Sequence, residues 1–214
     1  MKARTLANIL ESYRLAVVNS RDPEIEAALT GFGLTTEYLQ EGVDLYSETM
    51  TLVQDQNREK QEEAEAYDTY FAAQEAVQDT VTKTIKIVRL MAKEDQNLID
   101  RLRIPDSYPG AIAQWIEAVT TFYNNLLNET AFVTSLAPFG KTTETLTAER
   151  DAVIALKDLR NKAQVEKGES QEATRQRNLK LDELKAHVTQ LKGLAVLALA
   201  DKPQLLEKMG VLVR

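Results

Sequence analysis

The motif Phe-Gly-Leu-Thr-Thr-Glu at residues 32–37 returns as Phe-Gly-Lys-Thr-Thr-Glu at residues 139–144, and this pair decides the predicted fold. The offset between the two motifs, here called the repeat offset, is half the length of the 214-residue chain. The match runs without a gap from about residue 29 to residue 104, with roughly a quarter of the positions identical, as expected of an internal repeat. The sequence therefore predicts gene duplication, with one helical copy in residues 1–107 and a second in residues 108–214.

The register of this repeat is open before about residue 29. Val17-Val18-Asn19 fits Leu126-Leu127-Asn128 better when the repeat offset is lengthened by two positions. A small difference in length between the first two helices of each copy would account for the change.

The composition favours helices over strands. Eight glycines and five prolines are few for 214 residues, and they cluster at a handful of places instead of recurring like the turns of an all-β protein. The absence of cysteine excludes disulfides, thiolate zinc sites and cysteine nucleophiles. We therefore expect an all-α duplicated helical bundle with internal pseudo-two-fold symmetry, whose two copies share one core as a single domain.

Turn and capping residues indicate where the helices end. The first helix of each copy is expected at about 2–20 and 110–127. A short helix follows and stops at Gly33 or Gly140, since glycine suits the left-handed residue that closes a helix. The remaining boundary signals are Thr35 and Thr142 as N-caps, Glu37 and Glu144 in the following first turns, Asp201 as N-cap before Pro203, and Pro105 and Pro109 at the junction between the copies.

The middle of each copy allows two structures. Apolar residues at alternating spacings of four and three form helical seams, but this pattern fades through residues 54–68 and 161–177. The alternatives are a hairpin of two long helices, turning near Gly168 in the second copy, and one continuous helix of ~60 residues, which would be ~90 Å long. The fading pattern favours the hairpin. The seams are Leu39, Val43, Tyr46, Met50 and Val53; Val77, Val81, Thr84, Val88 and Met91; and Leu184, Val188, Leu191, Ala195 and Ala198.

The string Gly140-Lys141-Thr142 resembles the end of a phosphate-binding loop but lacks the rest of that motif. The motif requires glycine five positions before Gly140, where Ser135 stands, and it requires a preceding strand. The first copy keeps the capping residues in Gly33-Leu34-Thr35 without the lysine. We therefore interpret the string as a helix stop followed by a helix start, with Lys141 exposed to solvent.

No catalytic or metal-binding constellation can be assembled from the sequence. His187, the one histidine, lies four residues after Glu183 on the same helix face, which is the wrong spacing for a di-iron bundle. A serine nucleophile would have no other histidine as its base. We therefore expect no enzyme activity, no cofactor and no metal, and a solvated or partly packed His187.

Charge distinguishes the two copies in their polar middle segments. Residues 48–73 hold seven acidic and two basic side chains, whereas residues 155–180 hold four acidic and seven basic ones. We expect these charged arms to form an interaction surface. The nearby aromatic group at Tyr67, Tyr70 and Phe71 is interpreted as core and hairpin packing, with a contact surface as the alternative. The candidate residues are Glu59, Glu62, Glu63, Glu65, Asp68, Arg160, Lys162, Lys167, Arg175 and Arg177.

These features predict a non-enzymatic interaction or scaffolding protein that binds a protein partner or another copy of itself through its charged arms. The alternatives are a small-ligand or sensory module with a pocket between the two copies, and an enzyme. A net charge of −7 argues against nucleic acid as the partner. No apolar run approaches the ~20 residues that span a bilayer, and the amino-terminal residues lack the pattern of a secretory signal, so a cytoplasmic location is expected.

Overall fold

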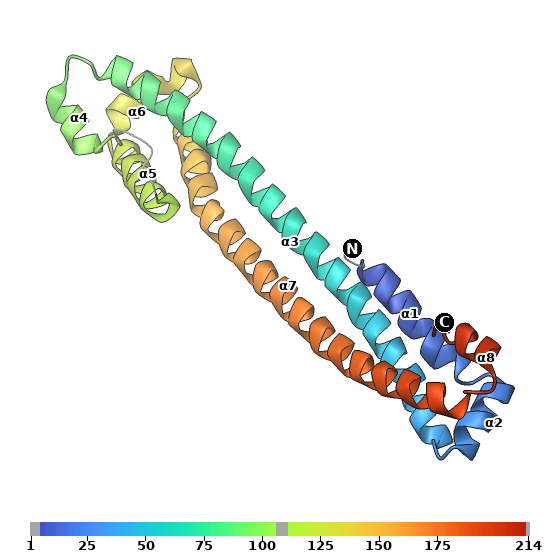
Figure 1. Cartoon of the computed structure of the whole chain (residues 1–214). Helices are drawn as coiled ribbons and strands as arrows, with labels where there is room; N and C mark the ends of the chain where they lie inside the picture. Colours follow the sequence, from blue (N-terminus) through green and yellow to red (C-terminus); the bar gives the residue numbers. More distant parts are fainter. Residues whose placement is uncertain (1–4, 106–110, 213–214) are drawn as a thin grey trace. The chain divides into compact units, whose positions relative to one another are not determined.

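The computed structural model describes residues 5–105 and 111–212, and all regular structure in these ranges is helical (Figure 1). The predicted all-α class is therefore confirmed. Pro109 lies outside the described residues. The elements are α1 (Leu6–Asn19), α2 (Pro23–Gly31), α3 (Thr36–Met91), α4 (Gln96–Leu102), α5 (Ile112–Asn128), α6 (Thr130–Leu136), the 3-10 turn η1 (Ala137–Phe139), α7 (Thr143–Ala198) and α8 (Pro203–Lys208).

The predicted hairpins are wrong, because α3 and α7 are each one unbroken helix of 56 residues. Gly168, the expected turn, lies inside α7. Small and polar side chains continue the buried positions where the apolar pattern fades, and residues with high helix propensity, such as Glu, Gln, Lys, Arg and Ala, fill the exposed positions. The buried side chains in these stretches include Gln56 and Ala66 on α3 and Ala163 and Ser170 on α7.

The predicted caps of the two long helices are confirmed. Gly33 and Gly140 have φ angles of 113° and 73°, which are the left-handed values that glycine accepts without strain. The Thr35 hydroxyl accepts a hydrogen bond from the Tyr38 backbone N–H at 3.1 Å, and Thr142 caps α7 in the same way. The last boundary differs slightly from the prediction, because Lys202 rather than Asp201 precedes α8, although Pro203 does begin it.

The chain divides into two compact units, and each takes a part of both sequence halves. Unit 1 combines Met1–Lys60 with Glu169–Arg214, so α1, α2 and α8 pack with the beginning of α3 and the end of α7. In Figure 1 α1 and α2 are blue and α8 is red, while the beginning of α3 is light blue to cyan and the end of α7 is orange. Helix α1 lies beside α8, where the Asn19 amide donates a hydrogen bond to the Lys208 carbonyl. The fully buried side chains of its core include Val17, Ile25, Leu29, Leu39, Leu184, Leu191 and Met209.

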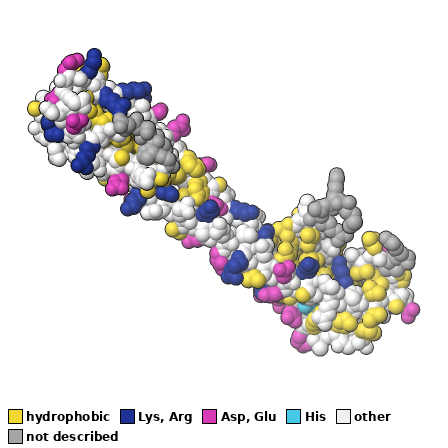
Figure 2. Space-filling model, turned by 60° about the vertical axis from the view of Figure 1, so that its left-hand side comes forward, with side chains coloured by type: hydrophobic (Ala, Val, Ile, Leu, Met, Phe, Trp, Pro, Cys, Tyr) yellow, Lys and Arg dark blue, Asp and Glu magenta, His cyan; other side chains and the backbone are white. Residues whose placement is uncertain are grey.

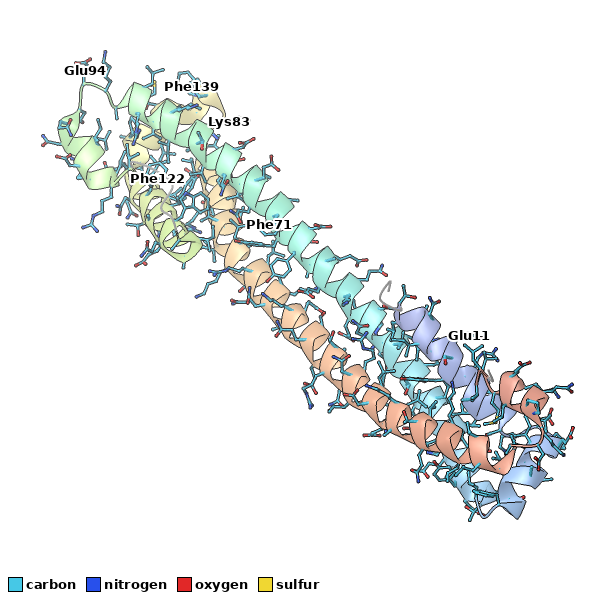
Figure 3. All side chains as sticks on the ribbon, viewed as in Figure 1. Glu11, Phe71, Lys83, Glu94, Phe122 and Phe139 are labelled. Atoms are coloured by element: carbon cyan, nitrogen blue, oxygen red, sulfur yellow. The ribbon has the colours of Figure 1, made fainter. Side chains whose placement is uncertain are left out.

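Unit 2 comprises Gln61–Gly168 and has a core of its own. It contains the end of α3, the helices α4, α5 and α6, and the beginning of α7. Helix α5 contributes most of the aromatic packing in this core through Trp115, Phe122 and Tyr123, which are all buried. Figure 3 shows Phe122 on α5 amid the surrounding side chains of this unit.

The helix bounds follow the repeat offset of the sequence. At this offset Thr36, which begins α3, corresponds to Thr143, which begins α7. Their last residues, Met91 and Ala198, correspond in the same way, and the first residue of α4 corresponds to the first residue of α8. Burial follows the same offset, since Leu39 and Leu146 are both fully buried at the starts of α3 and α7.

Within the described ranges, no helix is both long enough and apolar enough to cross a membrane.

Candidate functional site

The ten residues predicted as an interaction surface all lie on α3 or α7, but they do not form one patch. Glu62, Glu65 and Lys162 line a hollow of about 310 Å³ between the two helices in unit 2, and Glu166 completes its charged rim. In this hollow, acidic side chains of α3 lie close to a basic side chain of α7. Of the other candidates, Asp68 and Lys167 are exposed, and Glu59 and Glu63 are half-buried.

The three arginines of the predicted basic arm have different surroundings. Arg175 pairs with Glu172 on its own helix through contacts of 2.8 and 2.6 Å, and this hydrogen bonding lowers the pKa of Glu172 to about 2. Arg177 is half-buried and its Nη1 donates to Gln56 Oε1 at 3.3 Å. Arg160 lines a separate hollow beside α5. Arg175 is therefore an exposed side chain that pairs within its own helix. Arg177 instead takes part in the packing between α3 and α7.

The stretches of α3 and α7 that carry these residues belong to neither core. Residues 47–72 of α3 and 160–183 of α7, here called the arm segments, are all described and contribute nothing to either hydrophobic cluster. They nevertheless expose large apolar side chains, with Phe71 56% exposed and Val165 58% exposed. Figure 3 labels Phe71 on α3, and Figure 2 shows hydrophobic side chains interspersed among charged ones on the face in view.

The aromatic group predicted on α3 is a real ring cluster. The ring of Phe71 lies 5.8 Å from the ring of Tyr67 and 5.2 Å from that of Tyr70, measured between ring centroids. The Tyr67 hydroxyl accepts a hydrogen bond from the Gln164 amide of α7 at 2.9 Å. Tyr70 is buried, so the exposed part of the cluster is Phe71 with the edge of Tyr67.

A buried polar network in unit 2 was not predicted from the sequence. The Glu149 carboxylate accepts hydrogen bonds from Lys141 Nζ at 2.6 Å, from the Thr84 hydroxyl at 2.8 Å and from the Tyr123 hydroxyl at 2.9 Å. The side chains of Lys141 and Glu149 are only 12% and 9% exposed. The prediction of a solvent-exposed Lys141 is therefore wrong, because the side chain folds back onto α7 and pairs with this carboxylate.

Burial shifts the titration of Tyr123 in this network. Desolvation, the charge of Glu149 and its hydrogen bond together raise the pKa of Tyr123 far above its ordinary value, so its hydroxyl stays protonated and donates to the carboxylate. The sequence did carry one signal of the network. At the repeat offset, Lys141 and Glu149 replace Leu34 and Gly42, so two charges appear together at positions that are apolar or small in the other half.

The one histidine of the sequence, His187, lies in unit 1 and is closely packed. His187 is 8% exposed, its ring lies 4.3 Å from that of Tyr38, and its Nε2 is buried without a hydrogen-bond partner among the described residues. A Cβ added at Gly42 would lie 2.6 Å from this Nε2, so the glycine makes room for the ring. His187 is thus a packed residue, as one of the predicted alternatives held.

This packing predicts a pH dependence of stability. Burial lowers the pKa of His187, and the nearby Glu41 carboxylate only partly opposes this effect. A folded-state pKa below the unfolded value of about 6.5 means that His187 contributes stability above that pH, and that this contribution is lost as pH falls below it. Urea denaturation between pH 7.5 and 5.5 should show this fall. A His187→Gln variant should lack it, and equal slopes for both proteins would contradict the assignment.

Comparison of the chain with protein-family models, curated proteins and solved structures gives no match.

Proposed function

We propose that this is a non-enzymatic, cytoplasmic interaction protein that acts through its arm segments, and that a second copy of the chain is its partner. The observation that carries the proposal is the exposure of Phe71 and Val165 on stretches that belong to neither hydrophobic core. Neither side chain belongs to a hydrophobic core of its own chain, although Phe71 contacts the rings of Tyr67 and Tyr70. Exposed apolar groups rimmed by charge are typical of protein-binding surfaces.

Charge complementarity favours a second copy as the partner. The arm segment of α3 holds seven acidic and two basic side chains, whereas that of α7 holds five acidic and six basic ones. Two copies related by a two-fold axis can therefore place each acidic α3 segment against the weakly basic α7 segment of the other copy. Exposed ion pairs contribute only about 0–1 kcal/mol each, so the charges set orientation and the apolar side chains supply most of the affinity. The packed surroundings of His187 support a protein without catalytic function.

We also infer that the chain arose by duplication of a helical unit, which gave it internal pseudo-two-fold symmetry. The coincident bounds of α3 and α7 at the repeat offset support this inference, as do the matching caps at Gly33 and Gly140. Copies at residues 1–107 and 108–214 would then each contribute to both compact units.

The test is sedimentation velocity over a range of protein concentrations at low and high salt. The wild type is expected to self-associate, and Lys167→Glu with Arg175→Glu is expected to weaken association about three- to thirtyfold at low salt, because each reversal removes up to ~1 kcal/mol. The effect should shrink at high salt, since exposed charges are screened over ~8–10 Å. Arg177 is left intact because it contacts Gln56.

The matched control reverses Lys83 and Lys86, two exposed lysines of α3 outside the arm segments, of which Lys83 is labelled in Figure 3. This variant changes net charge equally and should associate like the wild type. Thermal melts of both variants should match the wild type. A wild type that stays monomeric at all concentrations, or a control that weakens association equally, would refute self-association through the arm segments.

A further inference from the structure

A hollow of about 510 Å³ lies between α5 and α7 in unit 2, outside the arm-segment surface described above except for Arg160. This volume falls within the range of small-molecule sites, which are concave, mostly apolar and contain a few polar groups. Ile116 of α5 and Ile154 of α7 supply its apolar lining. Ile154 remains 43% exposed, so the core of unit 2 does not use its full surface.

The first indication that the hollow binds a ligand comes from the Thr120 hydroxyl. It lines the hollow, and its Oγ1 is buried with no hydrogen-bond partner among the described residues. Threonines on other helices of the chain donate to the carbonyl four residues earlier, as Thr49 and Thr80 do on α3 and Thr134 does on α6. A buried hydroxyl that makes no such bond costs free energy, and a ligand atom that accepts its proton would remove that cost.

The charged side chains that line the hollow favour a negatively charged ligand. Lys157 and Arg160 lie three residues apart on α7, and within the described part of the chain neither forms an ion pair. Glu117 of α5 is the one carboxylate in the lining, which leaves one net positive charge. An arginine and a lysine together bind a carboxylate well, because guanidinium offers two parallel donors and ammonium adds a point charge.

We propose that this hollow binds an amphipathic carboxylic acid. The apolar chain or ring of the ligand lies against Ile116 and Ile154, and its carboxylate pairs with Arg160 and Lys157. The Thr120 hydroxyl donates to an oxygen of the ligand. This inference does not depend on the proposed self-association, because Arg160 is the one charged residue of the arm segments that lines the hollow.

The probes are octanoate, octan-1-ol and octylammonium, which share one apolar chain and differ in charge. Binding is followed by isoleucine methyl NMR shifts, with calorimetry as a second measurement. Octanoate is expected to bind with a dissociation constant of about 0.1–1 mM, a value ordinary for a ligand of this size. The alcohol should bind at least severalfold more weakly, and the ammonium more weakly still. Shifts should be confined to a few isoleucine methyl groups.

Two variants test the assigned roles. Lys157→Gln with Arg160→Gln should abolish the preference for octanoate over octan-1-ol. Thr120→Val should weaken octanoate binding severalfold without lowering the melting temperature of the free protein, because the hydroxyl has no partner to lose. The matched control, Lys162→Gln with Lys167→Gln, removes two charges from the same helix away from this hollow and should bind octanoate like the wild type.

Three results would overturn the proposal: equal binding of all three probes, shifts spread over most isoleucine methyl groups, or a preference for octanoate over octan-1-ol that survives the Lys157 and Arg160 changes. The proposed self-association is tested separately, because Thr120→Val should leave the sedimentation of the ligand-free protein unchanged. A protein that self-associates without binding octanoate would refute this inference alone.

Discussion

Replacing Glu149 with alanine is expected to lower the free energy of unfolding by about 3–5 kcal/mol, because it removes the common acceptor of a buried network. The change leaves the Lys141 ammonium without its counter-charge and deprives the Thr84 and Tyr123 hydroxyls of their acceptor. Each buried polar group left unpaired costs about 1–3 kcal/mol. Urea denaturation followed by the fluorescence of Trp115, the one tryptophan, measures the loss within the same unit.

A double-mutant cycle separates the ion pair from the rest of the network. Lys141→Met removes the charge and keeps most of the side-chain length, and Glu149→Leu removes the carboxylate. The double variant should be more stable than the sum of the single losses predicts, with a coupling energy of at least about 1 kcal/mol. Losses that simply add, or a Glu149→Ala loss below about 1 kcal/mol, would mean that Lys141 and Glu149 are solvated and independent.

Local signals in the sequence predicted the helix ends better than the helix lengths. Gly33, Gly140, Thr35 and Thr142 act within a few residues of themselves, so their roles follow from residue type alone. The hairpin prediction failed because the apolar pattern measures hydrophobicity rather than burial. A helix continues wherever small or polar side chains fill the inward positions, as Ser170 does on α7. Where the buried positions of a helix hold small or polar residues, the sequence shows no hydrophobic periodicity although the helix continues.

The candidate sites depend on contacts between residues distant in sequence. Thr84 and Tyr123 reach Glu149 across 65 and 26 residues, and no spacing rule links them. The charge contrast between the arm segments was visible in the composition, but the composition could not distinguish exposed Arg175 from half-buried Arg177. That distinction depends on the rotation of α7 about its axis, which only the packed structure defines. Sequence therefore predicted which helices carry the charges and not which charges face solvent.

Gly42 in unit 1 and Gly168 in unit 2 allow a paired test of whether a close contact excludes a side chain from a helix. Gly42→Ala is expected to lower the free energy of unfolding by about 1–3 kcal/mol, even after the ~1 kcal/mol that alanine adds in a helix, because overpacking forces buried groups to move. The added Cβ would lie 2.6 Å from Nε2 and 2.9 Å from Cδ2 of His187, whose ring is held against Tyr38. Thermal and urea denaturation measure the change.

Gly168→Ala is the matched control, because it lies within α7 and a Cβ there would meet no atom within 4 Å. It should stabilise the protein by about 0.4–1 kcal/mol, since alanine lowers the entropy of the unfolded chain. The cause of the Gly42→Ala loss is tested by repeating that change in a His187→Ala background, where the ring is absent. There the glycine replacement should be neutral or stabilising, and a loss as large as in the wild type would show that the ring is not what excludes a side chain at position 42.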